Sequence, residues 1–366
     1  MGMGKKLLII MDSMAGGGAE KALAVLLRHL DANKIHITLL LFNATGPRMG
    51  DIPAHVKTLA VYHGGKPLRD RLAFQTPLRD RLMARQLRRL LGGERFDVAL
   101  SFLEGAAAWL HSLLPHDVAS RHLSWVHTDL TRNHWSRVFF KQEENEHAFY
   151  SRLDGLIFAS GDAMRAFPFE VETPKHVVHN IIDRDEVRQL ATALEFPKCG
   201  FTLCYVGRLH SVKRPDRFID TVALLRDEGI DVQAWLVGDG DERQRLEHQC
   251  RDKGLNDRVT FWGFQQNPYP FIAQADALVI ASDAEGFSLV MLEALTLGTP
   301  VVATRCAGPT EVLSHGGGLL TDFTPEALAT AIKELRDNPD IISHPDLPAA
   351  FTTSHIIAQI TNLLNP

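Results

Sequence analysis

Short apolar runs alternate along this chain with longer segments of helical periodicity, and this alternation limits the fold more than any other feature. Parallel strands joined by crossover helices produce such a pattern, because a helix must return the chain to the same edge of the sheet after each strand. In the first half, the pattern predicts strands at Lys6–Met11, Ile35–Phe42, Asp97–Phe102, Leu123–His127 and Gly155–Ala159, and helices at Ala19–Leu30 and Arg79–Leu91.

The same alternation starts again after residue 183. The intervening segment Ile182–Lys198 is charged and contains Pro197, which favours a linker. The strands expected beyond it are Phe201–Val206, Val232–Val237, Val259–Phe261, Ala277–Ala281 and Pro300–Ala303. The expected helices are Pro215–Asp227, Asp241–Lys253, Tyr269–Gln274, Ser288–Leu297 and Ser354–Leu364, with a last strand–helix unit in Gly317–Leu335.

The chain has 366 residues, more than the about 250–300 residues that one hydrophobic core usually serves. We therefore expect an α/β protein with two Rossmann-like doubly wound domains facing across a cleft. The expected parts are residues 1–183, residues 184–345, and a C-terminal helix in residues 346–366 that can pack back on the N-terminal domain. Folds of this kind bind ligands at the carboxyl ends of their strands, so the site is expected there.

Charge is distributed unevenly between the halves. Residues 1–183 carry 23 Lys and Arg against 19 Asp and Glu, whereas residues 184–366 carry 16 against 25. The basic excess lies in Lys66–Arg95, with nine bases and three acids among interleaved apolar residues. Such a segment favours an anionic membrane surface, and the alternative is an ordinary helix packed on the sheet. Nucleic acid is not expected as a partner, because the net charge is -5 and no aromatic stacking surface accompanies these bases.

Composition predicts a cytoplasmic protein without a metal, with peripheral attachment to the inner face of the cell membrane as an alternative. No apolar run approaches the roughly 20 residues that span a bilayer, and the run Leu7–Met11 is too short for a signal peptide. The four cysteines form no CxxC pair or ligand cluster, which favours buried thiols in a reducing compartment.

A glycine-rich loop, Gly16–Glu20, stands between an expected strand and an expected helix. Glycines there let backbone amides approach an anion, and the start of the helix adds partial positive charge. The spacing matches neither a Walker loop nor the dinucleotide fingerprint, so a tight turn remains the alternative.

Two cations, Arg208 and Lys213, follow the strand Phe201–Val206. An Arg can hold a diphosphate in bidentate fashion and a Lys can hold it as a point charge. These two side chains are therefore candidates to bind a diphosphate in the cleft, and the alternative is a solvated loop with surface cations.

Two acids, Glu285 and Glu293, flank the start of the helix expected after Ala277–Ala281. Glu285 lies on the loop near the cleft, and Glu293 lies in an otherwise apolar helix, where the hydroxyls of a nucleotide ribose would give it a role. The free amides of Gly286–Leu289 could hold phosphate. In the alternative interpretation, Glu285 is a carboxylate favoured by the helix dipole and Glu293 is solvated.

The sequence resembles the large retaining glycosyltransferase family called GT4, also known as glycosyltransferase group 1, which has the GT-B fold. The resemblance is ordered from about residue 201 to 337, and thinner in the first half. One departure is Gly308–Glu311, where many members of the family have two glycines. The similar pieces are Gly17–Glu20, Ser124–His127, Asn180–Asp183, Arg208, Lys213, Val237–Gly240, Trp262–Phe264, Glu285 with Glu293, and Leu297–Ala303.

The resemblance implies a retaining, metal-independent hexosyltransferase of bacterial polysaccharide synthesis. It would move a sugar from a nucleoside diphosphate sugar, with UDP preferred, to a lipid-linked saccharide or a surface polysaccharide such as lipopolysaccharide or capsule. The N-terminal domain would bind the acceptor and the second domain the donor. No cofactor is implied. The implied catalytic residues are His127, Glu285, Arg208 and Lys213, and the implied donor-binding residues are Gly17, Gly18, Arg208, Lys213, Asp239, Phe264, Gly286, Phe287, Ser288, Leu289 and Glu293.

Alternatives to this interpretation stay open. His127 would contact the transferred sugar by the resemblance, although a lone histidine is more often structural. The whole chain could be a sugar-nucleotide epimerase on the same fold, since a fold does not determine a function. It could also be a non-catalytic subunit that only binds a sugar nucleotide.

Overall fold

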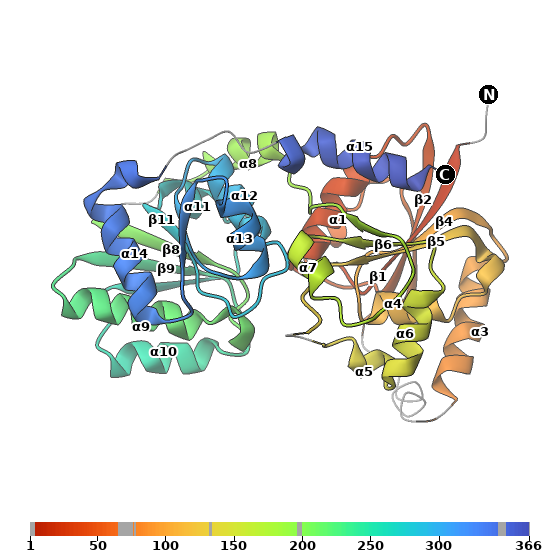
Figure 1. Cartoon of the computed structure of the whole chain (residues 1–366), viewed down its shortest axis with the longest axis horizontal. Helices are drawn as coiled ribbons and strands as arrows, with labels where there is room; N and C mark the ends of the chain where they lie inside the picture. The colour runs from red at the N-terminus through yellow and green to blue at the C-terminus, as the bar shows by residue number, and fades with distance from the viewer. Residues whose placement is uncertain are drawn as a thin grey trace. The chain divides into compact units, whose positions relative to one another are not determined.

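The computed structural model describes residues 4–64, 76, 78–131, 134–195, 200–342 and 349–365. The chain divides into two compact units. Unit 1 consists of Met1–Ile181 and Ser354–Pro366, and unit 2 of Ile182–Thr353. Each unit is a parallel sheet with helices on both faces, which is the expected α/β class (Figure 1).

Unit 1 contains a seven-stranded parallel sheet in the order β3-β2-β1-β4-β5-β6-β7. The strands are β1 (Lys5–Met11), β2 (Ile35–Asn43), β3 (Lys57–Tyr62), β4 (Phe96–Ser101), β5 (Ala119–Val126), β6 (Gly155–Phe158) and β7 (Lys175–Val177). The helices are α1 (Gly18–His29), α3 (Arg79–Leu91), α4 (Ala106–Ser112), α5 (Arg137–Phe140), α6 (Glu143–Ser151), α7 (Gly161–Arg165) and α15 (Thr353–Leu364).

Unit 2 contains a six-stranded parallel sheet in the order β10-β9-β8-β11-β12-β13. The strands are β8 (Phe201–Val206), β9 (Val232–Val237), β10 (Val259–Gly263), β11 (Ala277–Ile280), β12 (Val301–Thr304) and β13 (Gly318–Thr321). The helices are α8 (Arg184–Ala191), α9 (Pro215–Asp227), α10 (Arg243–Asp252), α11 (Tyr269–Gln274), α12 (Leu289–Thr296), α13 (Ala307–Leu313) and α14 (Pro325–Asp337).

The central strands of both sheets are buried on both faces. In β1, every residue of Leu7–Met11 is buried, and Leu7 pairs with Ile37 of β2 on one side and with Val98 of β4 on the other. All four residues of β11 are buried as well. Parallel sheets covered by helices need such continuous apolar strands, which explains the uninterrupted runs in the sequence.

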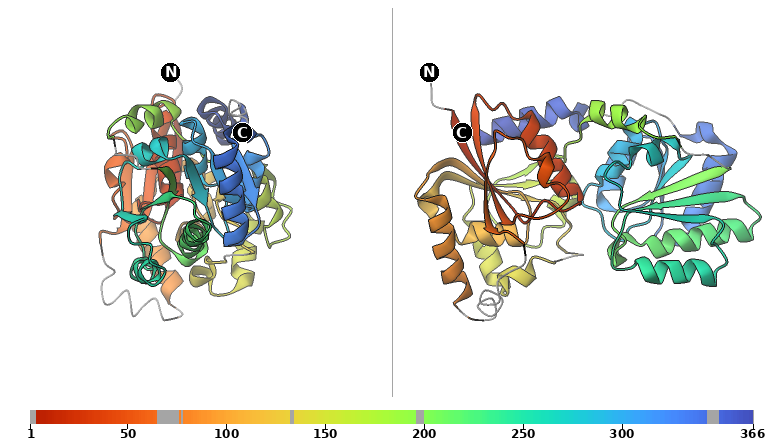
Figure 2. Two further views of the ribbon diagram at one scale, coloured as in Figure 1. Left: turned by 90° about the vertical axis from the view of Figure 1, so that its left-hand side faces the viewer. Right: turned by 180° about the vertical axis from the view of Figure 1, so that it is seen from behind.

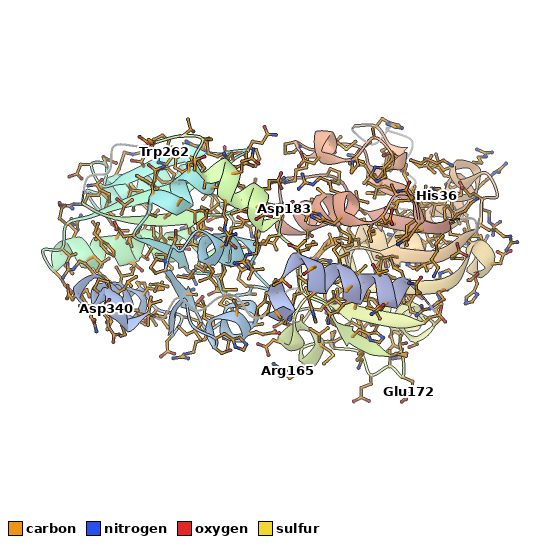
Figure 3. The ribbon with its side chains drawn as sticks, turned by 90° about the horizontal axis from the view of Figure 1, so that it is seen from above. His36, Arg165, Glu172, Asp183, Trp262 and Asp340 are labelled. Atoms are coloured by element: carbon orange, nitrogen blue, oxygen red, sulfur yellow. The ribbon has the colours of Figure 1, made fainter. Side chains whose placement is uncertain are left out.

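The prediction of a linker at Ile182–Lys198 is wrong for residues 184–191, which form α8. Asp183, labelled in Figure 3, caps this helix by accepting a hydrogen bond of 3.0 Å from the backbone N–H of Glu186. Val187 is buried, and α8 packs against α11 and α12 of unit 2. An N-cap, a buried apolar side chain and packing on two helices of unit 2 therefore order this charged segment.

The helix α15 belongs to unit 1, although it follows unit 2 in the sequence (Figure 2). The ammonium of Lys5, at the start of β1, donates to the side chain of Asn365 at 3.0 Å. Arg121 of β5 donates to the carbonyl of Leu363 at 2.8 Å. The chain therefore leaves unit 1 after Ile181 and returns to it after Thr353.

Both sheets have a point where the strand order reverses direction. In unit 1 this point lies between β1 and β4, and in unit 2 between β8 and β11. Loops that follow these strands diverge to opposite faces and leave room for a ligand at the carboxyl ends. None of the helices formed by the described residues has the length and hydropathy of a membrane span.

Candidate functional site

In unit 2, the loops after β8 and β11 meet at the point where the strand order reverses. The backbone N–H of Asp283, after β11, donates to the carbonyl of Val212, after β8, at 2.9 Å. The sequence-predicted cation Lys213 and acid Glu285 lie on these two loops. The fold thus brings together two candidate residues that are 72 positions apart in the chain.

Lys213 and Glu285 form an ion pair. The ammonium of Lys213 lies 2.6 Å from Oε2 of Glu285, and the hydroxyl of Ser282 donates to Oε1 at 2.7 Å. Glu285 is buried, whereas about a third of the Lys213 side chain is exposed. A lysine ammonium has three donors, so Lys213 keeps capacity for the oxygens of an anion while Glu285 fixes its position.

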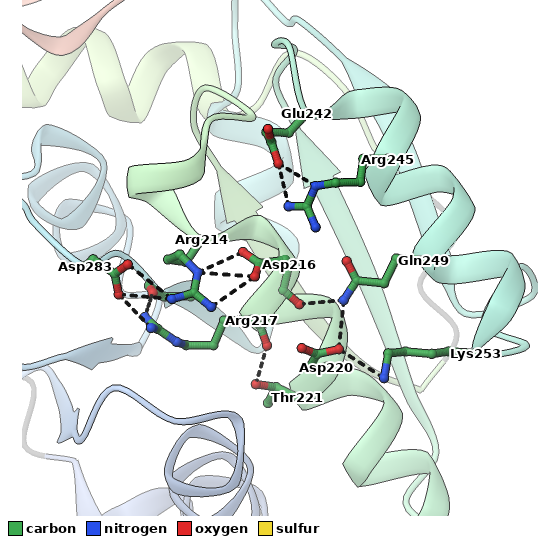
Figure 4. A network of polar contacts seen from close by, with 11 residues as sticks. Arg214, Asp216, Arg217, Asp220, Thr221, Glu242, Arg245, Gln249, Lys253 and Asp283 are labelled. Atoms are coloured by element: carbon green, nitrogen blue, oxygen red, sulfur yellow. Dashed lines mark hydrogen bonds and ion pairs between the residues drawn. The ribbon is translucent and has the colours of Figure 1, made fainter.

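An arginine–aspartate network holds the two loops in place, and the sequence analysis gave it no role (Figure 4). Arg214 binds Asp216 through Nη2 at 3.0 Å and Asp283 through Nη1 at 3.1 Å. The buried Arg217 donates to Asp283 at 2.6 Å and to the carbonyl of Ala281. Hydrogen bonding to Asp216 raises the pKa of Arg214 above its usual value, so the Arg214 guanidinium is charged at every physiological pH.

Arg208 reaches into solvent from a backbone that is fixed by glycines. The backbone N–H of Leu209 donates to the carbonyl of Asp239 at 3.0 Å. A Cβ at Gly238 would lie 1.9 Å from the carbonyl oxygen of Gly207, so only glycine allows this approach. Arg208 and Asp239 therefore lie on two loops in direct contact, after β8 and β9, and both side chains are exposed.

The loop of residues 286–289 leads into α12 and carries a backbone of unusual conformation. Ser288 has a φ of 62°, and its buried hydroxyl has no hydrogen-bond partner among the described residues. A positive φ at a residue other than glycine is costly and is concentrated at functional sites. Phe287 is buried, and Phe264, after β10, is exposed.

Glu293 lies inside α12 with only 3% of its surface exposed. The alternative that it is a solvated surface residue is therefore wrong. A carboxylate buried in an apolar helix needs polar partners, which is consistent with a role in the site.

At Gly308–Glu311, where the sequence has a single glycine, the structure shows why that glycine is needed. Gly308 lies in the first turn of α13, and a Cβ there would lie 2.5 Å from the Cα of Phe287. Its N–H donates to the carbonyl of Glu285 at 3.4 Å. One glycine is thus required where α13 contacts the loop of residues 285–288, and Pro309 and Thr310 continue the helix.

In unit 1, His127 follows β5 and is 6% exposed. Its ring stacks on Trp125 with a centroid distance of 5.4 Å, and neither ring nitrogen has a partner of hydrogen-bond geometry among the described residues. Burial lowers the pKa of His127 to about 3, against a smaller raising contribution from Asn180. The imidazole is therefore neutral and can donate from one nitrogen and accept at the other.

The glycine loop of unit 1 precedes α1. A Cβ at Gly17 would lie 2.5 Å from a carboxylate oxygen of Glu20, so that side chain folds back over the loop. Gly18 begins α1. Gly17, Gly18 and His127 belong to unit 1, and the remaining predicted site residues belong to unit 2.

Two further acids of unit 1, Asp12 and Glu104, follow β1 and β4, and the sequence analysis did not single them out. Burial is the main reason that the pKa of Asp12 is raised to about 7; a backbone hydrogen bond from Ala107 lowers it, and the charges of Glu104 and Glu20 contribute to the increase. Neither acid stands in a recognisable motif, so only the strand order could have indicated them.

The described part of the chain offers few residues for metal binding or for thiol chemistry. No group of three or more His, Cys, Asp or Glu side chains there could hold a metal ion. Cys204, Cys250 and Cys306 are free and buried, and Cys199 lies outside the described residues.

Comparison with known proteins finds relatives that match much of unit 2. The model of "Glycosyl transferases group 1" matches residues 200–338. The lipopolysaccharide core biosynthesis glycosyltransferase LpsD of Rhizobium meliloti (strain 1021) is 38% identical over 148 residues, which cover 40% of this chain and 42% of LpsD. A GDP-mannose-dependent alpha-(1-6)-phosphatidylinositol dimannoside mannosyltransferase of Mycobacterium tuberculosis (strain ATCC 25177 / H37Ra) is 35% identical over 141 residues, 38% of this chain and 36% of that protein. The chain thus spans less than half the length of these curated relatives in the matches.

Solved structures match over nearly the whole chain. HepE of Anabaena in complex with UDP-glucose has a TM-score of 0.77 at 22% identity, over 98% of this chain and 99% of HepE. The apo form of the lipopolysaccharide outer core galactosyltransferase WaaB has a TM-score of 0.67 at 20% identity, over 98% of both chains. At such low sequence identity, the likeness to these structures is one of fold, and the neighbours are GT-B glycosyltransferases. The chain therefore has the GT-B fold, and its residues 200–338, within unit 2, match the family model of glycosyl transferases group 1.

Proposed function

We propose that this protein is a retaining, metal-independent glycosyltransferase of the GT4 type. It takes its sugar from a nucleoside diphosphate sugar, with UDP as the preferred nucleotide, and transfers it to a lipid-linked saccharide or a surface polysaccharide. The observation that carries the proposal is the ion pair of Lys213 and Glu285, braced by Asp283, at the carboxyl ends of β8 and β11. This arrangement fits a donor with a diphosphate beside a hydroxyl-rich sugar.

The chemistry required is the stabilisation of a leaving diphosphate. As the bond from the anomeric carbon to the phosphate oxygen breaks, negative charge grows on the diphosphate, and the fixed charges of Lys213 and Arg208 oppose it. The acceptor oxygen bonds to the anomeric carbon on the same face, and its proton passes to the departing phosphate oxygen. Glu285 positions sugar hydroxyls, Glu293 binds the ribose, and neutral His127 contacts the transferred sugar.

The choice of UDP rests on the neighbours and the family resemblance. HepE was solved with UDP-glucose, whereas the mycobacterial relative is named as GDP-mannose-dependent. The nucleobase is therefore part of the experiment. Isothermal calorimetry with UDP, GDP and ADP should give measurable binding for UDP at micromolar to millimolar concentration. Failure of all three nucleotides to bind would overturn the proposed donor class.

The reaction itself is tested with a panel of UDP-sugars. Donors are first selected by thermal shift, since a ligand that binds only the folded state raises its stability. The selected donor is then incubated with and without lipid-linked saccharide acceptors, and the products are analysed by NMR. We expect acceptor-dependent transfer with the anomeric configuration of the donor. A sugar epimer formed without acceptor would identify an epimerase, and binding without turnover would identify a non-catalytic subunit.

The acceptor is proposed to lie at an anionic membrane, and helix α3 supports this. Leu78 and Leu82, one turn apart, are 54% and 51% exposed, and Arg81, Arg85 and Arg89 are exposed around them. Arginines beside exposed leucines suit the interface of an anionic bilayer.

Only part of the basic stretch is available to a membrane. The opposite face of α3, with Met83 and Leu87, is buried in unit 1. Arg79 is buried as well, with its guanidinium 4.5 Å from the ring of Trp109. The part of Lys66–Arg95 in residues 66–75 and 77 lies outside the described residues. The protein would then work on the inner face of the cell membrane as a peripheral cytoplasmic enzyme.

The membrane proposal is tested by co-sedimentation with liposomes. Vesicles with anionic lipid should sediment the protein at low salt, and binding should weaken at high salt. The double variant L82S/R85S should bind less, whereas a change of two exposed residues elsewhere in unit 1, K34S/H36S, should not. Equal absence from anionic and neutral vesicles at low salt would remove the membrane claim and leave the transferase proposal intact.

A further inference from the structure

A buried carboxylate, Glu104, holds the segment that contains His127. Glu104 follows β4 and is 0% exposed. Its Oε2 accepts the backbone N–H of His127 at 2.9 Å, and its Oε1 accepts the hydroxyl of Thr128 at 2.6 Å and the indole N–H of Trp135 at 3.2 Å. Among the described residues, no cation lies within ion-pair distance of Glu104. Its two carboxyl oxygens are therefore satisfied by these three donors, as a buried polar group requires.

The neighbouring Gly105 fixes the other end of the same segment. Gly105 has a φ of 85°, and a Cβ there would lie 2.2 Å from the ring of Trp135. The indole of Trp135 thus packs on the Gly105 backbone while its N–H binds Glu104. Residues 104 and 105 consequently hold both His127 and Trp135.

The groups beside this attachment are polar and buried, and three of their atoms have no partner of hydrogen-bond geometry among the described residues. Both ring nitrogens of His127 and Oδ1 of Asn180 have no hydrogen-bond partner among the described residues. The His127 ring packs against both Trp125 and Phe102, with a centroid distance of 4.9 Å to Phe102. Buried polar groups are normally satisfied, so orphan groups of this kind indicate a place where a ligand supplies the missing partners.

We propose that Glu104 is a positioning residue, which fixes the His127 imidazole so that it presents its free nitrogens to the hydroxyls of a sugar. This inference rests on the proposed function, because the ligand is taken to be the transferred sugar or its acceptor. Glu104 touches no substrate in this scheme. It acts through the His127 backbone and through the two side-chain donors that keep the segment in register.

The same unit offers a matched control, Glu146 of α6. Glu146 is also 0% exposed. It accepts the hydroxyl of Ser136 at 2.6 Å and a ring nitrogen of His134 at 3.0 Å. It therefore holds His134 and Ser136, and no hydrogen bond between described residues joins it to His127.

The first test is NMR of protein labelled with 15N-histidine, with the His127 and His134 signals assigned from the H127Q and H134Q variants. E104Q should shift the ring nitrogen resonances of His127 and leave those of His134 in place. E146Q should do the reverse. This readout requires no substrate, so it stands even if the proposed function fails. His127 resonances that stay at their wild-type positions in E104Q would overturn the proposal.

The second test is kinetic, with the UDP-sugar selected by the donor screen. E104Q should lower kcat by about ten- to a hundredfold, since small misplacements of a catalytic group have effects of that size. UDP affinity, which belongs to unit 2, should remain within about twofold of wild type. An equal fall of kcat in E146Q would show that Glu104 has only a structural role.

A milder variant keeps the proposal testable if E104Q does not fold. T128V removes one of the three donors to Glu104 and keeps the shape of the side chain. It should shift the His127 resonances in the same direction as E104Q and lower kcat by a smaller factor. Wild-type resonances together with a wild-type kcat in T128V would contradict the inference.

Discussion

Asp12 makes the stability of unit 1 depend on pH in a direction opposite to that of most carboxylates. It follows β1, and its Oδ1 accepts the backbone N–H of Ala107 at 2.6 Å. Burial is the main cause that raises the pKa of Asp12 from 3.8 to about 7, and the nearby charges of Glu104 and Glu20 add to it. The folded protein therefore keeps the Asp12 proton up to about pH 7, whereas the unfolded chain releases it near pH 4.

The sign and size of the effect follow from this difference. Between the two pKa values the folded state binds one proton more than the unfolded state, so stability falls as pH rises. The contribution is fully present below pH 3.8 and lost above about pH 7. From pH 5 to pH 7, each unit changes the free energy of unfolding by about 1.4 kcal/mol, for a total of about 3 kcal/mol. Part of Asp12 is solvent-accessible, so we expect about 2–3 kcal/mol.

The perturbation is Asp12→Asn, which cannot ionise. The assay is urea unfolding at pH 5 and pH 8, followed in β1 peptides by pulsed hydrogen exchange so that unit 1 is measured separately from unit 2. Relative to wild type, the variant should gain about 2–3 kcal/mol of stability at pH 8 compared with pH 5. Glu104→Gln should shrink this difference, because it removes one of the charges that raise the pKa of Asp12.

The control is Asp117→Asn on the surface of unit 1. The hydrogen bond from Arg95 holds the pKa of Asp117 below its usual range, so its contribution changes only in acid and stays constant between pH 5 and pH 8. The reasoning would be refuted if the difference in free energy of unfolding between wild type and Asp12→Asn were the same at pH 5 and pH 8. It would also be refuted if wild type became more stable relative to the variant at pH 8.

The remaining predictions concern unit 2. Glu293→Ala should weaken UDP binding in calorimetry by about tenfold and leave the circular dichroism spectrum unchanged; unchanged affinity would exclude the ribose assignment. Lys213→Met should lower kcat more than it raises the donor KM, because its contact strengthens as charge grows on the diphosphate, and a pure KM effect would contradict this. Gly308→Ala places a Cβ 2.5 Å from the Phe287 Cα and should destabilise unit 2 and weaken UDP binding, whereas Gly50→Ala, with open space at its Cβ, should be neutral in thermal unfolding. EDTA should leave wild-type turnover intact, and a loss of turnover in EDTA would contradict the proposal that the enzyme needs no metal ion.

Elements with strong local signals could be predicted from the sequence with their boundaries. Arg79–Leu91, Pro215–Asp227, Val232–Val237 and Tyr269–Gln274 match the helices α3, α9 and α11 and the strand β9. Glycine after the first helix and proline at the start of the second mark these ends directly. Here the local sequence and the tertiary fold favour the same structure, so local signals were sufficient.

Elements that depend on distant neighbours were missed. The strand β7 has three residues and is held at the edge of the sheet by pairing with β6. Only the last residues of the strand β3 are buried, and its first residues have the sequence pattern of a polar loop. The helices α4 to α7 are short, with four to nine residues each, too few to show a clear helical period.

The candidate site shows the same division. Lys213 and Glu285 could be named from residue type and position, but their ion pair depends on the contact between two loops. Glu104 and Asp12 read as ordinary loop acids in the sequence. Their burial and the raised pKa of Asp12 arise from strands that are far away in the chain. Local sequence does not contain that information.

The return of α15 to unit 1 has a consequence for protein synthesis. Unit 2 is continuous in the sequence, whereas unit 1 needs residues 354–365 to complete its hydrogen bonds to Lys5 and Arg121. A chain emerging from the ribosome therefore offers all of unit 2 before unit 1 is complete. A domain generally folds as a unit once its chain has been synthesised, so unit 2 can reach its native state first. The N-terminal sheet is completed only when α15 has been synthesised.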